Sequence, residues 1–177
     1  MKAAFILFDR MTFLDFIGFY DAVTRLKTMK IQEDFEWRTC AMSKHVTDDR
    51  NLKIEADIVG GSLAGYDLLF VPGGFGTRSL QNDAAFVDWL KTASATPLKI
   101  SVCTGALLLG AAGYLKGLRA TTHPSAYKEL EPYCKTVLQQ RVVALIEPIS
   151  ILVIGLVLGV VMVGVVLSMT SLTEIKL

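Results

Sequence analysis

The chain has 177 residues, a length typical of one domain, and its 18 Lys and Arg residues nearly balance 17 Asp and Glu residues. The formal net charge of +1 excludes a strongly basic nucleic-acid-binding protein and an acidic solvating tail. The hydrophobic fraction of 52% is high for a globular domain, and the excess lies after Arg141, where only Glu147, Glu174 and Lys176 are charged. The sequence therefore predicts an ordinary domain over residues 1–141 and an apolar tail over 142–177.

Predicted strands and helices alternate along the first part of the chain. Apolar runs of strand length are expected to form buried strands at Ala3–Phe8, Phe35–Ala41, Asp67–Val71 and Lys99–Val102. Apolar residues at helical spacing predict helices at Phe13–Leu26, Asp83–Ala95 and Ala106–Ala112, and Leu52–Ile54 is expected to be a short hairpin arm. This alternation predicts an α/β fold, a parallel sheet with helices on both faces.

Two glycine-containing segments follow strands of this predicted sheet, where parallel sheets bind their ligands. Pro72–Gly76 follows one strand, and Ser101–Gly105 joins another strand to a helix. A sharp strand-to-helix turn exposes its central residue, the nucleophile elbow, and here that residue is Cys103. We expect the helix N-terminus to lower the pKa of the thiol, and the N–H of Thr104, with one from the glycine loop, to form an oxyanion pocket.

Structural roles are the alternatives for these residues. Cys103 could be a buried core cysteine, Asp15 the N-cap of the first helix, and His123 a partly buried, hydrogen-bonded histidine. Cys40 and Cys134 lack comparable surroundings, and a structural role is expected for both.

Cysteine and histidine usage predicts neither disulfides nor a metal. Three cysteines without a CxxC pair indicate a reducing compartment, and the two histidines, His45 and His123, are far apart in the sequence. The apolar run after Lys2 is too short for a signal peptide. We therefore expect a cytoplasmic domain without a metal or other cofactor.

Several motifs, in order, resemble the ThiJ/PfpI superfamily of the flavodoxin-like, class I glutamine amidotransferase-like fold over residues 1–142. They are Leu14–Gly18, Val71–Gly76, Ser101–Ala106, Leu109–Gly113 and Arg119–His123. The chain is most similar to the isonitrile hydratase branch, lyases that add water to an isonitrile carbon to give an N-substituted formamide. The protease-like branch has His directly after the cysteine, whereas this chain has Thr104 there.

The resemblance implies a role for each matching residue. Cys103 would be the nucleophile, and Asp15 the proton donor and acceptor beside it. The N–H groups of Thr104 and Gly74 would be oxyanion donors, and His123 a supporting group nearby. Pro124 stands where the hydratase pattern usually has Trp, which leaves the substrate's organic group open.

The same resemblance implies a homodimer acting on a small-molecule substrate. Related sensor domains of AraC-type regulators share the cysteine elbow but carry a helix-turn-helix pair, which nothing after Arg141 resembles. With no basic patch in the sequence, nucleic acid is not an expected partner.

The tail has a different character. Ile149–Met169 contains 21 residues without a charge, which as a helix would span about 31 Å and match a bilayer core. With the preceding Glu147-Pro148 it resembles the C-terminal transmembrane helix of type II secretion and type IV pilus inner-membrane F proteins; the alternative is a buried core helix or strand pair. We therefore expect a C-terminally truncated domain anchored in the inner membrane, and a non-catalytic, chimeric membrane-tethered protein is the alternative function.

Overall fold

The computed structural model describes residues 1–143, which form one compact unit. The predicted membrane segment Ile149–Met169 lies outside the described residues and stays a prediction. Among residues 1–143, no helix has the length and apolar character needed to cross a bilayer.

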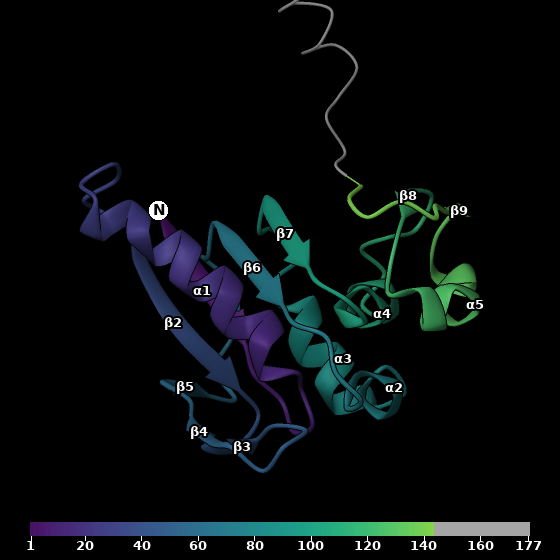
Figure 1. Cartoon of the computed structure of the whole chain (residues 1–177), viewed down its shortest axis with the longest axis horizontal. Helices are drawn as coiled ribbons and strands as arrows, with labels where there is room; N and C mark the ends of the chain where they lie inside the picture. Colours follow the sequence, from purple (N-terminus) through teal and green to yellow (C-terminus); the bar gives the residue numbers. More distant parts are fainter. Residues whose placement is uncertain (144–177) are drawn as a thin grey trace, which may run out of the picture. The chain divides into compact units, whose positions relative to one another are not determined.

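A five-stranded parallel sheet forms the centre of the fold (Figure 1). Its strands, in spatial order, are β5 (Ile58–Val59), β2 (Glu36–Ala41), β1 (Lys2–Ile6), β6 (Leu68–Val71) and β7 (Leu98–Ser101). The predicted parallel α/β sheet is thereby confirmed. The apolar runs of β1 and β6 occupy its centre and are almost completely buried, as expected for strands covered on both faces.

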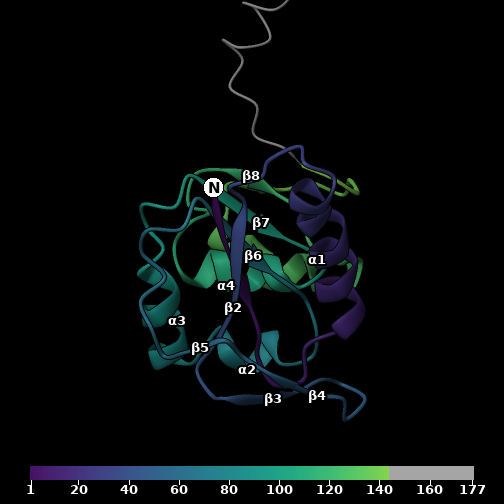
Figure 2. The ribbon, with the colours of Figure 1, turned by 90° about the vertical axis from the view of Figure 1, so that its left-hand side faces the viewer.

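Helices cover both faces of the sheet, as the side view in Figure 2 shows. Helix α1 (Phe13–Thr28) packs on one face, where Phe19 stacks on Phe70 of β6 with a ring-centroid distance of 4.2 Å. Helix α3 (Ala84–Lys91) packs on the other face through its buried Phe86, Trp89 and Leu90. Helix α4 (Gly105–Ala111) follows β7 and is buried along nearly its whole length.

Shorter elements complete the described unit. The expected hairpin arm is β4 (Lys53–Glu55), which pairs antiparallel with β3 (His45–Thr47). The sequence did not predict α2 (Thr77–Leu80), β5, or the parallel pair β8 (Arg119–Ala120) and β9 (Thr136–Val137). Between β8 and β9 lie the 3₁₀ turn η1 (Pro124–Ala126), α5 (Tyr127–Leu130) and the turn η2 (Glu131–Tyr133). Strands of two residues carry too little periodicity to be recognised from sequence.

Candidate active site

Cys103 occupies a strained turn between β7 and α4. Its φ is +54°, in the left-handed region that non-glycine residues rarely adopt. The turn is tight because α4 begins directly against the end of β6, where a Cβ on Gly105 would lie 2.3 Å from the Val71 carbonyl oxygen. The thiol is half-buried, so the fully buried core cysteine is not what the structure shows. Cys103 has the elbow geometry that the sequence predicts.

Asp15 meets Cys103 across Gly73. The Gly73 N–H donates a hydrogen bond to Asp15 Oδ2 over 3.2 Å. A Cβ on Gly73 would lie 2.6 Å from Cys103 Cβ and 2.8 Å from Asp15 Oδ2, so the two side chains converge because this position has none. The N-cap of α1 is Thr12, and Asp15 lies within the first turn, so the N-cap interpretation of Asp15 is wrong.

Burial dominates the acid–base properties of this pair. Burial raises the pKa of Asp15 above its ordinary value. Hydrogen bonds from the Gly73 N–H and the Cys103 thiol lower this pKa, but by less than burial raises it. Burial also raises the pKa of Cys103, and the charge of Asp15 adds to that shift, whereas the N–H and hydroxyl of Thr104 lower it. The expectation of a lowered thiol pKa is therefore wrong, because burial and the Asp15 carboxylate outweigh the N–H and hydroxyl of Thr104.

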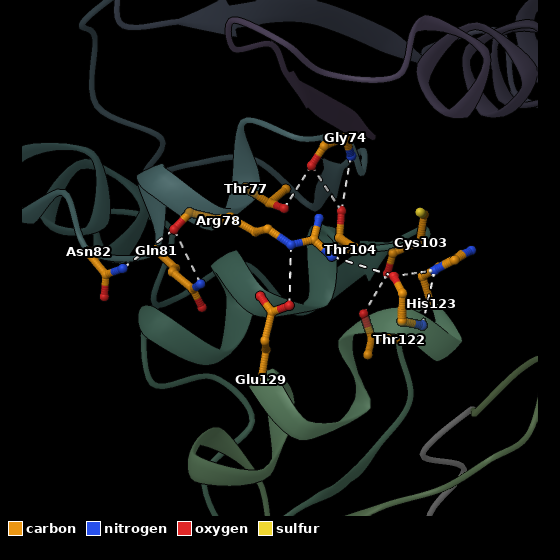
Figure 3. Close-up of polar contacts among 11 residues, drawn as sticks. Gly74, Thr77, Arg78, Gln81, Asn82, Cys103, Thr104, Thr122, His123 and Glu129 are labelled. Carbon is orange, nitrogen blue, oxygen red and sulfur yellow. Dashed lines mark hydrogen bonds and ion pairs between the residues drawn. The ribbon is translucent and has the colours of Figure 1, made fainter. Parts of the chain in front are cut away.

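Thr104 joins the elbow to the glycine loop. Its buried hydroxyl accepts a hydrogen bond from the Gly74 N–H at 3.0 Å and donates one to the Gly74 carbonyl at 3.1 Å (Figure 3). Thr77 donates to the same carbonyl at 2.8 Å. Two N–H groups were predicted as oxyanion donors. The Thr104 N–H forms a hydrogen bond that lowers the pKa of the Cys103 thiol, whereas the Gly74 N–H already donates to the Thr104 hydroxyl.

His123 lies in a segment attached to the elbow. The neighbouring Thr122 donates a hydrogen bond from Oγ1 to the Cys103 carbonyl at 2.9 Å. The charge of His123 makes a small contribution that lowers the pKa of Asp15. His123 is exposed, so the partly buried alternative does not describe it.

The other two cysteines have structural surroundings. Cys40 is completely buried in β2, where burial raises its pKa to about 11. Cys134 bonds the Leu130 carbonyl at 3.6 Å, and burial raises its pKa also. Within the part of the chain that the structure describes, no three His, Cys, Asp or Glu residues gather as metal ligands.

The sequence did not single out several residues around the site. Gly73 was part of a recognised motif, and its close approach to Cys103 and Asp15 explains why a bare backbone is needed. Thr122 stood in the Arg119–His123 motif without a role of its own, and Arg78 and Ser125 carried no local signal, because the Arg78–Ser125 contact joins segments far apart in the sequence.

Comparisons with known proteins show the family of the chain. The family model described as the DJ-1/PfpI family matches residues 1–146. Isonitrile hydratase of Pseudomonas putida is 34% identical over 133 residues, which are 75% of this chain and 56% of that protein. The chain thus spans just over half the length of that curated relative.

Solved structures show the same fold. A ThiJ/PfpI family protein from Pseudomonas syringae has a TM-score of 0.69 and 30% identity, covering 81% of this chain and 58% of its own. Schizosaccharomyces pombe DJ-1 has a TM-score of 0.65 at 20% identity, covering 81% and 79%. None of these matches supports the predicted resemblance of the tail to secretion F proteins. The cysteine elbow, the glycine loop and these similarities lead to one conclusion: the chain belongs to the DJ-1/PfpI family.

Proposed function

We propose that this protein is a cysteine-dependent hydratase that adds water to an isonitrile and releases an N-substituted formamide. The observation that carries the proposal is the convergence of Asp15 and Cys103 across Gly73 at a strained elbow. The 34% identity with an isonitrile hydratase supports the choice of substrate. The family resemblance also supports action on a small molecule by a homodimer.

The proposed reaction begins with the thiol and the carboxylate. Because burial and the Asp15 charge raise the pKa of Cys103, we assign the cysteine as the thiol and Asp15 as its proton acceptor at the start of the reaction. Asp15 accepts the thiol proton as Sγ attacks the terminal isonitrile carbon, and it returns that proton to the same carbon, giving a thioimidate. The raised pKa of Asp15 favours the first transfer, since a more basic carboxylate accepts the proton more readily.

Hydrolysis of the thioimidate completes the cycle. Water adds to the carbon, and the tetrahedral intermediate expels the Cys103 sulfur, which regains a proton. The Thr104 N–H already lowers the pKa of the Cys103 thiol through a hydrogen bond. In the proposed reaction it stabilises the negative charge that develops on the oxygen or sulfur bound to this carbon. The net reaction consumes one isonitrile and one water and yields one formamide.

Formamide production from a simple alkyl isonitrile tests the proposal. We expect the full chain to turn over the substrate, and Cys103→Ala to show no turnover. Cys134→Ala is the matched control, because that thiol lies outside the site, and it is expected to keep full activity. Equal rates in the wild type and Cys103→Ala, or no product from folded wild-type protein, would refute the proposal.

We infer a second property from the charge-free stretch Ile149–Met169, namely that it tethers the domain to the inner membrane. The alternative to the enzyme is a non-catalytic protein that is tethered to the membrane and acts as an interaction module.

A further inference from the structure

A chain of polar contacts runs from α5 to His123 beside the elbow (Figure 3). Glu129 on α5 accepts a hydrogen bond from Arg78 Nε on α2 at 3.2 Å. A terminal nitrogen of Arg78 donates to Ser125 Oγ at 3.4 Å, and Ser125 Oγ lies 2.8 Å from His123 Nδ1. The contacts therefore run in series from Glu129 through Arg78 to Ser125, and Ser125 is the residue that contacts the ring nitrogen.

These contacts determine which nitrogen of the ring carries the proton. The Ser125 backbone N–H points at His123 Nδ1 over 3.3 Å, and an N–H can only donate. This long backbone contact favours a lone pair on Nδ1 and so favours the Nε2–H form of the neutral ring, and the shorter Ser125 hydroxyl contact adds to that preference.

Arg78 reinforces the same arrangement. Because Arg78 donates to Ser125 Oγ, that oxygen acts as an acceptor toward Arg78, and its own hydrogen is directed to Nδ1. The opposite tautomer would place an Nδ1–H against the Ser125 N–H, donor against donor. Glu129 in turn holds the guanidinium in place, in an ion pair that is only about one-third exposed on either side.

We propose that Ser125 and Arg78 are positioning residues that hold His123 as the Nε2–H tautomer, so that the ring presents a hydrogen-bond donor to the group bound at Cys103. The inference rests on the proposed function for the identity of that group, the thioimidate. The free Nε2–H donates a hydrogen bond to the imine nitrogen while water adds to the adjacent carbon. The Thr122 hydrogen bond to the Cys103 carbonyl keeps this segment beside the nucleophile.

The tautomer can be measured directly by long-range ¹H–¹⁵N correlation spectra of the ¹⁵N-labelled full chain, recorded at about pH 8.5, above the ordinary range of histidine titration. The chain has two histidines, so His123→Gln assigns the signals. We expect the Nε2–H form for His123 in the wild type. We expect at least a threefold larger Nδ1–H fraction in Ser125→Ala and Arg78→Met, and a return towards the wild-type ratio in Arg78→Lys.

Two matched controls remove similar groups elsewhere. Ser43→Ala removes a hydroxyl that bonds the His45 carbonyl and not a ring nitrogen, and Arg25→Met removes an exposed ion pair with Asp21 on α1. Both are expected to leave the His123 signals unchanged. An Nδ1–H ring in the wild type, or an unchanged tautomer ratio in both Ser125→Ala and Arg78→Met, overturns the inference.

Kinetics provide the second readout. With an isonitrile substrate, Ser125→Ala is expected to lower kcat about tenfold with little change in KM, because the lost contact acts on the reacting group and not on initial binding. A lower kcat without a tautomer change would also overturn the inference. If the wild type does not hydrate isonitriles, the proposed function fails, while the spectra still decide whether Ser125 and Arg78 position the ring.

Discussion

At the residue scale, the site depends on the absence of a side chain at Gly73. The Cys103 Cβ, the Asp15 carboxyl and the Thr104 nitrogen all lie within 2.8 Å of the position a Cβ would take there. Two of them cannot move easily, since Thr104 is buried and hydrogen-bonded to Gly74 and Cys103 is already strained. A single methyl group at residue 73 must therefore push the Asp15 carboxylate away from the Cys103 thiol.

We predict that Gly73→Ala lowers kcat/KM for an isonitrile at least about 100-fold, the scale on which a positioned acid–base group contributes. Gly18→Ala on α1 is the control, because no atom lies within 4 Å of the new methyl group. It should keep full activity and raise the free energy of unfolding by up to about 1 kcal/mol, since alanine favours a helix. Steady-state rates and urea unfolding measure the two effects, and an active Gly73→Ala protein would contradict the steric argument.

The Asp15 carboxylate is expected to support activity while lowering the stability of the fold at neutral pH. Burial raises the pKa of Asp15 in the folded state above the ordinary value of 3.8. Between pH 3.8 and the folded-state pKa, the folded protein binds more protons than the unfolded chain, so the free energy of unfolding falls as the pH rises through this range. The loss persists at neutral pH. We predict that Asp15→Asn raises Tm at pH 7 while lowering kcat at least about 100-fold, and that the Tm difference narrows as the pH falls towards 4.

Thermal unfolding of the two proteins across this pH range tests the sign. A less stable Asp15→Asn protein at pH 7 would show that hydrogen bonds to the carboxylate outweigh its burial.

At the element scale, a local signal sets where α3 begins, and a tertiary contact lies where it ends. Asp83 caps its N-terminus by accepting hydrogen bonds from the N–H groups of Ala85 at 2.9 Å and Phe86 at 3.2 Å. The C-terminus comes earlier than the periodicity predicts, at Lys91 and not Ala95. There the Thr92 hydroxyl donates to the Trp89 carbonyl and accepts the Leu63 N–H, a contact from another part of the chain.

We predict that Asp83→Ala lowers the free energy of unfolding by about 1 kcal/mol, the usual effect of losing an N-cap. Asp83→Ser should retain most of that stability. Asp88→Ala, which removes an exposed ion pair with Lys91 on the same helix, should cost at most about 0.5 kcal/mol. Urea unfolding compares the three variants, and equal losses in Asp83→Ala and Asp88→Ala would argue against the cap.

At the scale of the whole molecule, the chain joins a family domain to a stretch of different composition. Arginine at the centre of a membrane helix costs about 2.5–3.5 kcal/mol per residue on insertion scales. We predict that the full chain enters the detergent phase on Triton X-114 partitioning, and that a Val157→Arg, Val161→Arg double variant does not. Recovery of the unmodified chain in the aqueous phase would refute membrane tethering.

The sequence by itself determined the order of the longer strands and helices, the parallel sheet and the elbow at Cys103. These are local properties: the six-residue run Ala3–Phe8, the helical spacing of Phe16 and Phe19, and the Cys-Thr-Gly turn can each be recognised from neighbouring residues. Tertiary structure decided the sheet order, the two-residue strands, the sign of the Cys103 pKa shift and the Arg78–Ser125–His123 contacts. Each of these depends on burial or on partners distant in the chain, and burial in particular reversed the effect expected from the helix N-terminus.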